Sequence, residues 1–499
     1  MNLSDKTTRA VGWTTGAKIL QQLLQFGLSV VLMRLLGPEA FGLVWMVLVF
    51  SGFAGIFSEF GFGSALVQHP DVREEHRSSV FWMGMGMGLL LTAVFLFGAS
   101  LVADFYNEPM LKPMTQWMAL NFIIVAVGKV PRAMLQKEMR FDAIAKVTVI
   151  SLAVSGTVAV TVAVAGGGVW SLVAQRLTEA LVSSALFFRA YRWRPRFMWS
   201  RDAAGALFRY SLGLTGFNII NYWARSADNL LIGRFMGAGV LGLYSRAYSL
   251  MLLPLTQVVA VIGPVMFPAL SSIQHDKPRV RRAYLRVINV LTFITFPMML
   301  GLVLVADPFV RVVFGSAWLG VIPLIQVLGF VGLTQTLCNP CGWIYTSQGR
   351  TDWMFWWGLA GSGLLIVSIV TGILIGTVQA VAVAYLIGNL IITGPCIAIP
   401  GRLISMRLWD VWTAVRGNLS CALLMSAAVW LTGLAFPMGA RPVLILVAQV
   451  IVGVLTYSIL VWQTRQPALA EFLELRNRFR NRSSTGAAVQ TAPLAADKP

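Results

Sequence analysis

Charged side chains are scarce in this sequence. Asp, Glu, Lys and Arg together make up 12% of its 499 residues, against roughly 25% in soluble domains. Hydrophobic residues make up 57%, before the 46 glycines are counted. This balance excludes an ordinary soluble protein and predicts a membrane protein.

Residues typical of enzyme sites are also few. The sequence has three histidines and four cysteines, and the histidines lack the spacing of a metal site. Cys338 and Cys341 form a single C-N-P-C motif inside an apolar run, which is more typical of packing than of a zinc or redox site. The G-x-x-x-x-G-K-[S/T] loop of ATP-driven proteins is absent. The sequence therefore predicts no enzyme, no metal site and no cofactor.

Long apolar runs, by contrast, recur along the whole chain. An α-helix needs about 20 residues to cross the hydrocarbon core of a membrane. We count fourteen such runs, at residues 14–36, 41–66, 80–103, 114–135, 143–165, 168–189, 210–232, 241–270, 287–306, 319–345, 354–376, 378–399, 417–436 and 441–462. Barrel strands would be short and alternating in polarity. The expected fold class is all-α, a polytopic membrane protein of about 14 transmembrane helices.

The positions of the basic residues explain the net charge of +19. If the N-terminus is cytoplasmic, 30 of the 39 Lys and Arg residues fall in cytoplasmic segments. Four fall in connections on the opposite side, namely Lys112, Arg234, Arg311 and Arg441. This asymmetry is the positive-inside signal, and it predicts that both termini are cytoplasmic. Basic loops beside anionic lipid need no nucleic acid as a partner.

The chain also contains an internal repeat with an offset of 200 residues. Residues 34–43, R-L-L-G-P-E-A-F-G-L, align without a gap with residues 234–243, R-F-M-G-A-G-V-L-G-L. The shared Arg, Gly and Leu positions indicate a duplication. Six spans separate the copies, so both have the same orientation, as in transporters built from two parallel repeats. We expect Arg34 and Arg234 to act in helix termination and capping.

The same register aligns polar residues of the first and seventh spans. Their spacing puts each set on one helical face, and a polar face inside a membrane is expected to turn inward. The candidates for a substrate cavity are Lys18, Gln21, Gln22, Gln25, Arg176, Asn218, Asn221, Tyr222 and Arg225. The candidates for ion coupling are Glu59, Glu179 and Asp228. For Arg176 with Glu179, and for Arg225 with Asp228, a structural ion pair between residues three apart is the alternative.

Four segments resemble the polysaccharide transporter family of the multidrug/oligosaccharidyl-lipid/polysaccharide (MOP) exporter superfamily. They are R-L-L-G-P-E-A-F-G-L (34–43), S-E-F-G-F-G-S-A-L-V-Q (58–68), D-N-L-L-I-G-R-F-M-G-A-G-V-L-G-L-Y-S (228–245) and V-M-F-P-A-L-S (265–271). The resemblance covers roughly residues 1–460. It is closest to the Wzx-type, colanic-acid-exporter-like branch.

The resemblance implies two six-helix lobes and two further helices. We expect an N-lobe at 1–205, a C-lobe at 206–400, an additional helix pair at 401–465, and a basic cytoplasmic tail at 466–499 that is partly disordered. The implied function is a flippase that moves undecaprenyl-pyrophosphate-linked oligosaccharide across the bacterial inner membrane, for exopolysaccharide or lipopolysaccharide synthesis. The implied partners are this substrate, membrane lipids and the polysaccharide polymerase and export machinery.

Two alternatives stay open. An exporter of drugs or small cations from the same superfamily would favour acidic over basic residues in its cavity. A membrane-bound polysaccharide polymerase or ligase would need a sizeable folded external segment. The external connections here are short, the longest being near 104–113 and 307–318. The sequence identifies neither the sugar carried nor the ion, proton or sodium, that drives transport.

Overall fold

The computed structural model describes residues 3–59, 63, 66–67, 72–198, 222–223, 225–437, 439–466 and 469. Throughout these residues the regular secondary structure is helical, without a strand. The expectation of an all-α fold is therefore confirmed.

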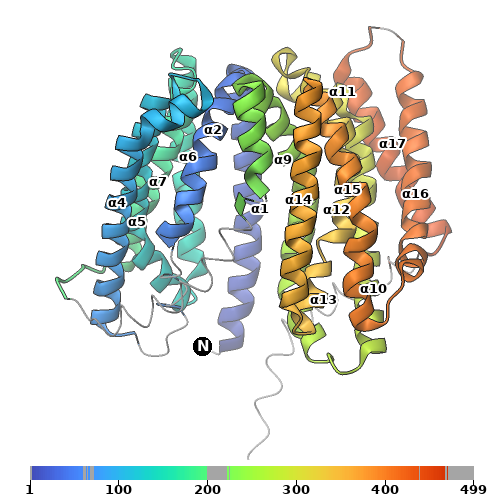
Figure 1. The fold of residues 1–499 in the computed structure, drawn as a ribbon, viewed down its shortest axis with the longest axis horizontal. Coiled ribbons are helices and arrows are strands. Elements are labelled where there is room, and N and C mark those ends of the chain that lie inside the picture. The colour runs from blue at the N-terminus through green and yellow to red at the C-terminus, as the bar shows by residue number, and fades with distance from the viewer. Residues whose placement is uncertain are drawn as a thin grey trace, which may run out of the picture.

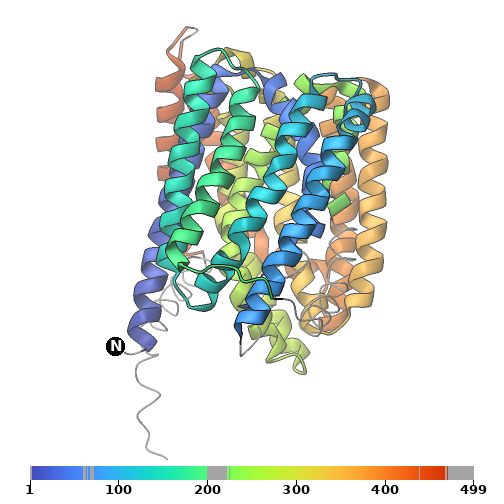
Figure 2. The ribbon, with the colours of Figure 1, turned by 90° about the vertical axis from the view of Figure 1, so that its left-hand side faces the viewer.

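The helices of the chain up to residue 198 form what we call the first helix group. They are α1 (Leu3–Leu35), α2 (Pro38–Glu59), α4 (Glu74–Tyr106), α5 (Leu111–Lys137), α6 (Phe141–Val164) and α7 (Trp170–Tyr191). In this group α4 packs on α5, α5 and α6 pack on α7, and α1 lies along α6. Figure 2 views the group from its outer side and shows α4 to α7 running roughly parallel.

A second helix group follows in the chain. It comprises a helix at 225–236 and then α9 (Ala238–Ser271), α10 (Lys277–Leu304), α11 (Ala306–Phe309), η1 (Val310–Phe314), η2 (Ser316–Trp318), α12 (Val321–Cys338), α13 (Cys341–Ser347), α14 (Thr351–Ile375), α15 (Val378–Gly401) and η3 (Arg402–Ile404). The last two helices, α16 (Leu408–Leu434) and α17 (Pro442–Gln463), form a pair in which α16 packs on α10. Figure 1 shows the two groups side by side, with this pair at the outer edge of the second.

Ten helices of the described residues are long and apolar enough to cross a membrane, and α1 adds the shorter apolar stretch Leu20–Leu35. Helices α7 and α9 lie on the runs predicted at 168–189 and 241–270. Most of the run predicted at 210–232 lies outside the described residues. The count of about 14 spans is compatible with this arrangement and stays a prediction.

The helix bounds follow from local chemistry. The run predicted as one span at 319–345 is two helices, α12 and α13, which meet at Asn339 and Pro340, because proline cannot donate the backbone hydrogen bond that a continuous helix requires. Helix α4 ends at Asn107, which adopts a left-handed backbone with φ of 54°, a conformation that asparagine tolerates. Helix α10 starts after Asp276, whose carboxylate accepts a hydrogen bond from the Arg279 backbone N–H at 3.0 Å.

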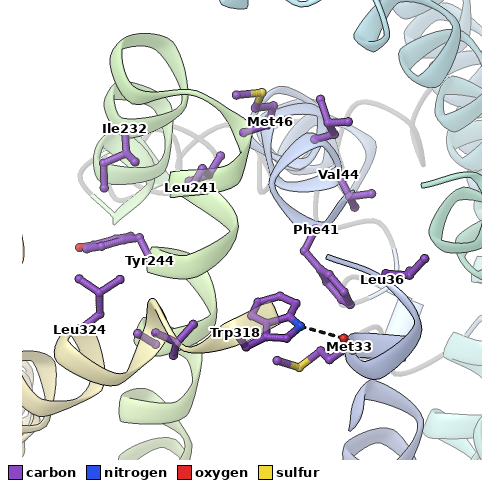
Figure 3. Close-up of a cluster of buried hydrophobic side chains, with 14 of the residues drawn as sticks. Met33, Leu36, Phe41, Val44, Met46, Ile232, Leu241, Tyr244, Trp318 and Leu324 are labelled. Carbon is purple, nitrogen blue, oxygen red and sulfur yellow. Dashed lines mark hydrogen bonds between the residues drawn. The ribbon is translucent and has the colours of Figure 1, made fainter. Parts of the chain in front are cut away.

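One end of the bundle is where α1 ends and α2 begins, and we call it the α1–α2 end. It is the upper end in Figure 1, and α1 starts at the opposite end. The largest buried cluster lies near this end and joins the two groups. It contains Met33, Phe41 and Val44 from the first group and Leu241 and Tyr244 from the second (Figure 3).

Trp318 lies at the centre of this cluster and is fully buried. Its indole Nε1 donates a hydrogen bond to the Met33 carbonyl oxygen at 2.8 Å, and its ring meets that of Phe41 edge-on with 5.3 Å between centroids (Figure 3). Because lipid tails are as apolar as leucine, close packing and hydrogen bonds, not exclusion of water, hold such a junction together.

Arg34 and Arg234 bind the opposite helix group. Arg34 donates from Nε to the Val313 carbonyl at 3.0 Å and from Nη2 to the Val312 carbonyl. With the Asn107 amide oxygen turned toward the arginine, Arg234 Nη1 donates to Asn107 Oδ1 at 2.9 Å. The side chains therefore join the two groups, and the expected capping of their own helices does not describe them.

Truncation of Leu241 tests the importance of the shared cluster. Leu241 is 0% exposed and Leu253, on the same helix α9, is 37% exposed. We expect Leu241→Ala to destabilise the protein by about 2 kcal/mol or more because it leaves a cavity, and Leu253→Ala to cost much less. Thermal unfolding of the purified variants in detergent measures both. Equal losses of stability would contradict the assigned packing.

Candidate functional site

A cleft with basic and polar side chains on partly apolar walls, called the polar cleft below, opens in the first helix group. It consists of two adjoining cavities of about 210 and 230 Å³ between α2, α5 and α7. Both cavities are lined by Asn121, Val125, Lys129 and Arg176. The remaining lining residues are Leu48, Ser51, Gly52, Gly55, Ser58, Met118, Phe122, Gly128, Arg132, Glu179, Ala180, Ser183, Ser184 and Phe187.

The charge of this cleft is mainly positive. Lys129, Arg132 and Arg176 contribute three cations, and Glu179 contributes one carboxylate. The Lys129 ammonium is half-buried and donates to the carbonyl oxygen and the hydroxyl of Ser58, at 2.6 and 2.7 Å. Arg132 and Arg176 are exposed. Their planar guanidinium groups suit the paired oxygens of a phosphate.

Neutral hydrogen-bonding groups accompany the cations. Ser51 and Asn121 line the first cavity, and Ser183 lines the second beside Asn121. Hydroxyl and amide groups can both donate and accept hydrogen bonds. The cleft therefore offers cations for an anion and neutral groups for sugar hydroxyls.

Helix α1 carries the first set of predicted cavity residues. Lys18 and Gln25 are exposed and Gln21 and Gln22 are half-buried. The lining of the two cavities comes from α2, α5 and α7, without α1. Of the predictions from the second copy, Asn218 and Asn221 lie outside the described residues.

Tyr222 crosses from the second group to the wall of the cleft. Its hydroxyl donates to the carbonyl oxygens of Val49 and Leu48, at 2.6 and 3.3 Å. It occupies the space that a Cβ on Gly52 would need, at 2.6 Å from that position. Arg225 is exposed. The structure thus places Arg176 and Glu179 in the cleft lining and Tyr222 against α2, whose residues Leu48 and Gly52 line the first cavity.

The two predicted ion pairs do not form among the described residues. Neither Arg176 with Glu179 nor Arg225 with Asp228 makes a salt bridge. Asp228 is only 5% exposed. Its Oδ1 accepts from the Asn229 backbone N–H at 2.7 Å, and its Oδ2 accepts from the Tyr244 hydroxyl at 3.3 Å. The side chain of Glu59 lies outside the described residues.

Other polar groups surround this buried carboxylate. The rings of Tyr244 and Tyr248 stack with centroids 6.0 Å apart, and Tyr248 meets Tyr385 at 6.2 Å. Gln335 Nε2 donates to the Tyr385 hydroxyl at 3.4 Å. The hydrogen-bond donors that meet this carboxylate are neutral, and burial of an anion among neutral donors is costly. Arg225 acts on Asp228 electrostatically without forming a salt bridge with it.

Sequence reasoning missed Lys129 and Arg132, which lie in the last part of the run at 114–135 and which it counted only among the cytoplasmic basic residues. Helix α5 continues to Lys137, so both residues belong to it. The available signal was helical spacing, since Asn121, Val125, Lys129 and Arg132 recur every three or four residues and share one face.

Comparisons with known proteins agree with this architecture. Lipid II flippase MurJ, in its inward closed conformation, matches with a TM-score of 0.70 at 16% identity, over 91% of this chain and 99% of that chain. An inward-facing multidrug resistance MATE transporter of the MOP superfamily matches with a TM-score of 0.60 at 14% identity, over 77% and 94%. At this identity the likeness shows the fold.

Sequence relatives are more similar. Lipopolysaccharide biosynthesis protein WzxC of Escherichia coli (strain K12) is 31% identical, over 74% of this chain and 76% of the relative. Succinoglycan biosynthesis transport protein ExoT of Rhizobium meliloti (strain 1021) is 28% identical, over 97% and 98%. Teichuronic acid biosynthesis protein TuaB of Bacillus subtilis (strain 168) is 30% identical, over 67% and 70%.

The family model described as polysaccharide biosynthesis protein matches residues 31–323. That range includes both copies of the repeat and the whole of the polar cleft. This polytopic membrane protein therefore belongs to the polysaccharide biosynthesis protein family, in agreement with the resemblance of its four segments.

Proposed function

We propose that this protein is a flippase for lipid-linked oligosaccharides. It moves repeat units carried on undecaprenyl pyrophosphate from the cytoplasmic to the periplasmic leaflet of the bacterial inner membrane, for exopolysaccharide or lipopolysaccharide synthesis. The names of WzxC, TuaB and ExoT, which refer to polysaccharide synthesis and transport, support this proposal. So does the fold shared with a lipid II flippase.

The observation that carries the proposal is the basic, polar cleft between α2, α5 and α7. A glycan and a pyrophosphate cannot enter hydrocarbon without replacement of their hydrogen bonds to water. Lys129, Arg132 and Arg176 supply positive charge for the pyrophosphate, and Ser51, Asn121 and Ser183 supply partners for hydroxyl groups. The proposed pathway is completed by Lys18, Gln21, Gln22 and Gln25 of α1 and by Asn218, Asn221, Tyr222 and Arg225.

The two helix groups are the proposed lobes. The N-lobe is 1–205, the C-lobe is 206–400, the additional helix pair is 401–465 and the tail is 466–499. Rocking of the lobes exposes the cleft to one side of the membrane at a time. The positive-inside distribution supports cytoplasmic termini, with the α1–α2 end outside.

The protein works as a transporter and not as an enzyme in this proposal. It needs no metal or cofactor, and its partners are the lipid-linked substrate, membrane lipids and the polymerase and export machinery. A drug or small-cation exporter is the second candidate, supported by the buried Asp228 and by Glu179 in the cleft. The excess of cations in the cleft favours the anionic substrate.

Replacement of Arg176 tests the cleft. We expect Arg176→Gln to weaken the apparent affinity for lipid-linked oligosaccharide about tenfold or more, because a hydrogen bond to a charged group contributes about 1.5–3 kcal/mol. Uptake of labelled substrate into proteoliposomes measures it. Arg189→Gln, on the same helix α7 but outside the cleft lining, is the matched control. Normal transport by Arg176→Gln would remove this residue from the site.

Arg225 provides a separate test of the second copy. We expect Arg225→Ala to reduce polymer export in cells while the protein still reaches the membrane, because the pathway then loses a cation. Immunoblotting of the membrane fraction and the yield of polymer are compared in the same cells. Normal polymer output would exclude Arg225 from the mechanism.

Asp228 is the proposed site of ion coupling. Asp228→Asn keeps the size of the side chain and removes its capacity to bind a proton or sodium ion as a carboxylate. We expect flux in proteoliposomes to lose its dependence on an imposed proton or sodium gradient. Asp352→Asn, which alters a carboxylate paired with Arg350 at 2.9 Å outside this cluster, is the control. If flux in Asp228→Asn still depends on the imposed gradient, a residue other than Asp228 binds the coupling ion.

The proposed orientation is tested by cysteine labelling of intact cells. In a variant without the four native cysteines, Ala440→Cys lies between α16 and α17 and His275→Cys lies before α10. We expect a membrane-impermeant maleimide added outside to label Ala440→Cys and not His275→Cys, as the positive-inside rule requires. Labelling of His275→Cys and not of Ala440→Cys would show that the protein has the opposite orientation in the membrane.

A further inference from the structure

The two copies of the internal repeat contact one another. Gly42 of α2 lies against the backbone carbonyl of Ala238, and Gly242 of α9 lies against the backbone carbonyl of Pro38. Positions 38 and 42 correspond to 238 and 242 at the offset of 200 residues. The contact is therefore reciprocal, as at an interface between two identical subunits related by a two-fold axis.

This approach of α2 and α9 requires glycine at both positions. A Cβ placed on Gly42 or Gly242 would coincide with the carbonyl oxygen opposite it. Those oxygens belong to the backbone, so no rotation of a side chain relieves the overlap. Gly239, three residues before Gly242, has nothing within 4 Å of a Cβ. The close approach therefore depends on two particular glycines and not on glycine content in general.

The repeated arginines also reach across to the opposite helix group. Arg34 binds carbonyl oxygens of Val312 and Val313, which follow α10 and α11 in the second group. Arg234 binds Asn107, which follows α4 in the first group. At the offset of 200 residues Asn107 corresponds to position 307 and not to 312 or 313, so the two acceptors are not equivalent positions. Each copy of the repeat nevertheless binds the other helix group through its arginine.

Further contacts close the space beside these segments. Arg246 of α9 donates from Nη1 to the Ser29 hydroxyl of α1 at 3.0 Å, and its guanidinium lies 4.7 Å from the centroid of the Phe41 ring. Trp318 donates to the Met33 carbonyl within the shared apolar cluster (Figure 3). The described contacts thus link α1 and α2 to the second group across the α1–α2 end.

We propose that residues 34–43 and 234–243 form a symmetric external gate. The gate closes the α1–α2 end when the two copies meet at Gly42 and Gly242, and it opens when α2 and α9 separate. The inference rests on the proposed function for its orientation and for the rocking of the lobes. The arginines bind carbonyl and amide oxygens, and water can replace such hydrogen bonds at small net cost. The gate is therefore reversible.

The rate at which a cysteine below the gate is labelled from outside tests the proposal. Ser51→Cys lines the cleft on α2 and is introduced into full-length protein without the four native cysteines. A membrane-impermeant maleimide is added to intact cells. We expect Gly242→Ala to raise the labelling rate about tenfold, because the added Cβ disfavours the closed state and shifts the population toward the open one. The control Gly239→Ala is expected to label like its parent.

A second pair of variants covers the case in which Gly242→Ala does not accumulate in the membrane. Arg34→Gln and Arg234→Gln each remove one arginine contact between the helix groups, and neither residue is in the buried core. We expect each to raise the labelling rate and the double variant to raise it further. An unchanged rate in a correctly inserted Gly242→Ala protein, or in the double arginine variant, would overturn the gate.

This experiment separates the gate from the cargo. Labelling of Ser51→Cys reports opening and requires no knowledge of the substrate. If the glycine and arginine variants accelerate labelling while the protein of unchanged sequence does not transport lipid-linked oligosaccharide, the gate stands and the proposed cargo is wrong. If transport is observed and labelling does not respond, the cargo stands and the gate is wrong.

Discussion

The absence of water from the hydrocarbon core governs this structure. Every backbone polar group at that depth must find its partner within the protein. The backbone satisfies this requirement as helices, and several polar side chains add hydrogen bonds between helices. The indole of Trp318 donates to Met33, the ammonium of Lys129 to Ser58, and the hydroxyl of Tyr222 to Val49. These bonds join helices that are distant in sequence and so determine which surfaces meet.

The two helix groups have kept matching contact surfaces and acquired different interiors. In the first group, α2, α5 and α7 surround a cleft rich in cations. In the second group, Asp228 lies buried among tyrosines. Under the proposed function, an anionic cargo and a driving cation occupy separate halves, which reduces the neutralisation of one by the other. Movement of one half relative to the other then couples the two sites.

The sequence predicted the helices well because the signal for a membrane helix, a long apolar run, is local. It singled out Arg176 as a cavity residue and Glu179 as an ion-coupling residue because intramembrane charge is itself unusual, and both line the cleft. It missed Lys129 because basic residues near the end of a run were counted as topology signal, and because the partner, Ser58, lies on a different helix, α2. It misassigned Arg34 because the acceptors are 278 and 279 residues away. Hydropathy is a local property of the sequence, so it does not predict contacts between distant segments.

The close contact between α2 and α9 also explains which positions of the repeat could diverge. The groups that face Gly42 and Gly242 are main-chain oxygens, which every amino acid carries. Position 38 is therefore free to be proline in one copy while its counterpart 238 is alanine, and the sequence has this difference. Positions 42 and 242 have no such freedom, because their role depends on the lack of a side chain. At this contact the two copies therefore share the lack of a side chain, while the residues that supply the main-chain oxygens differ between them.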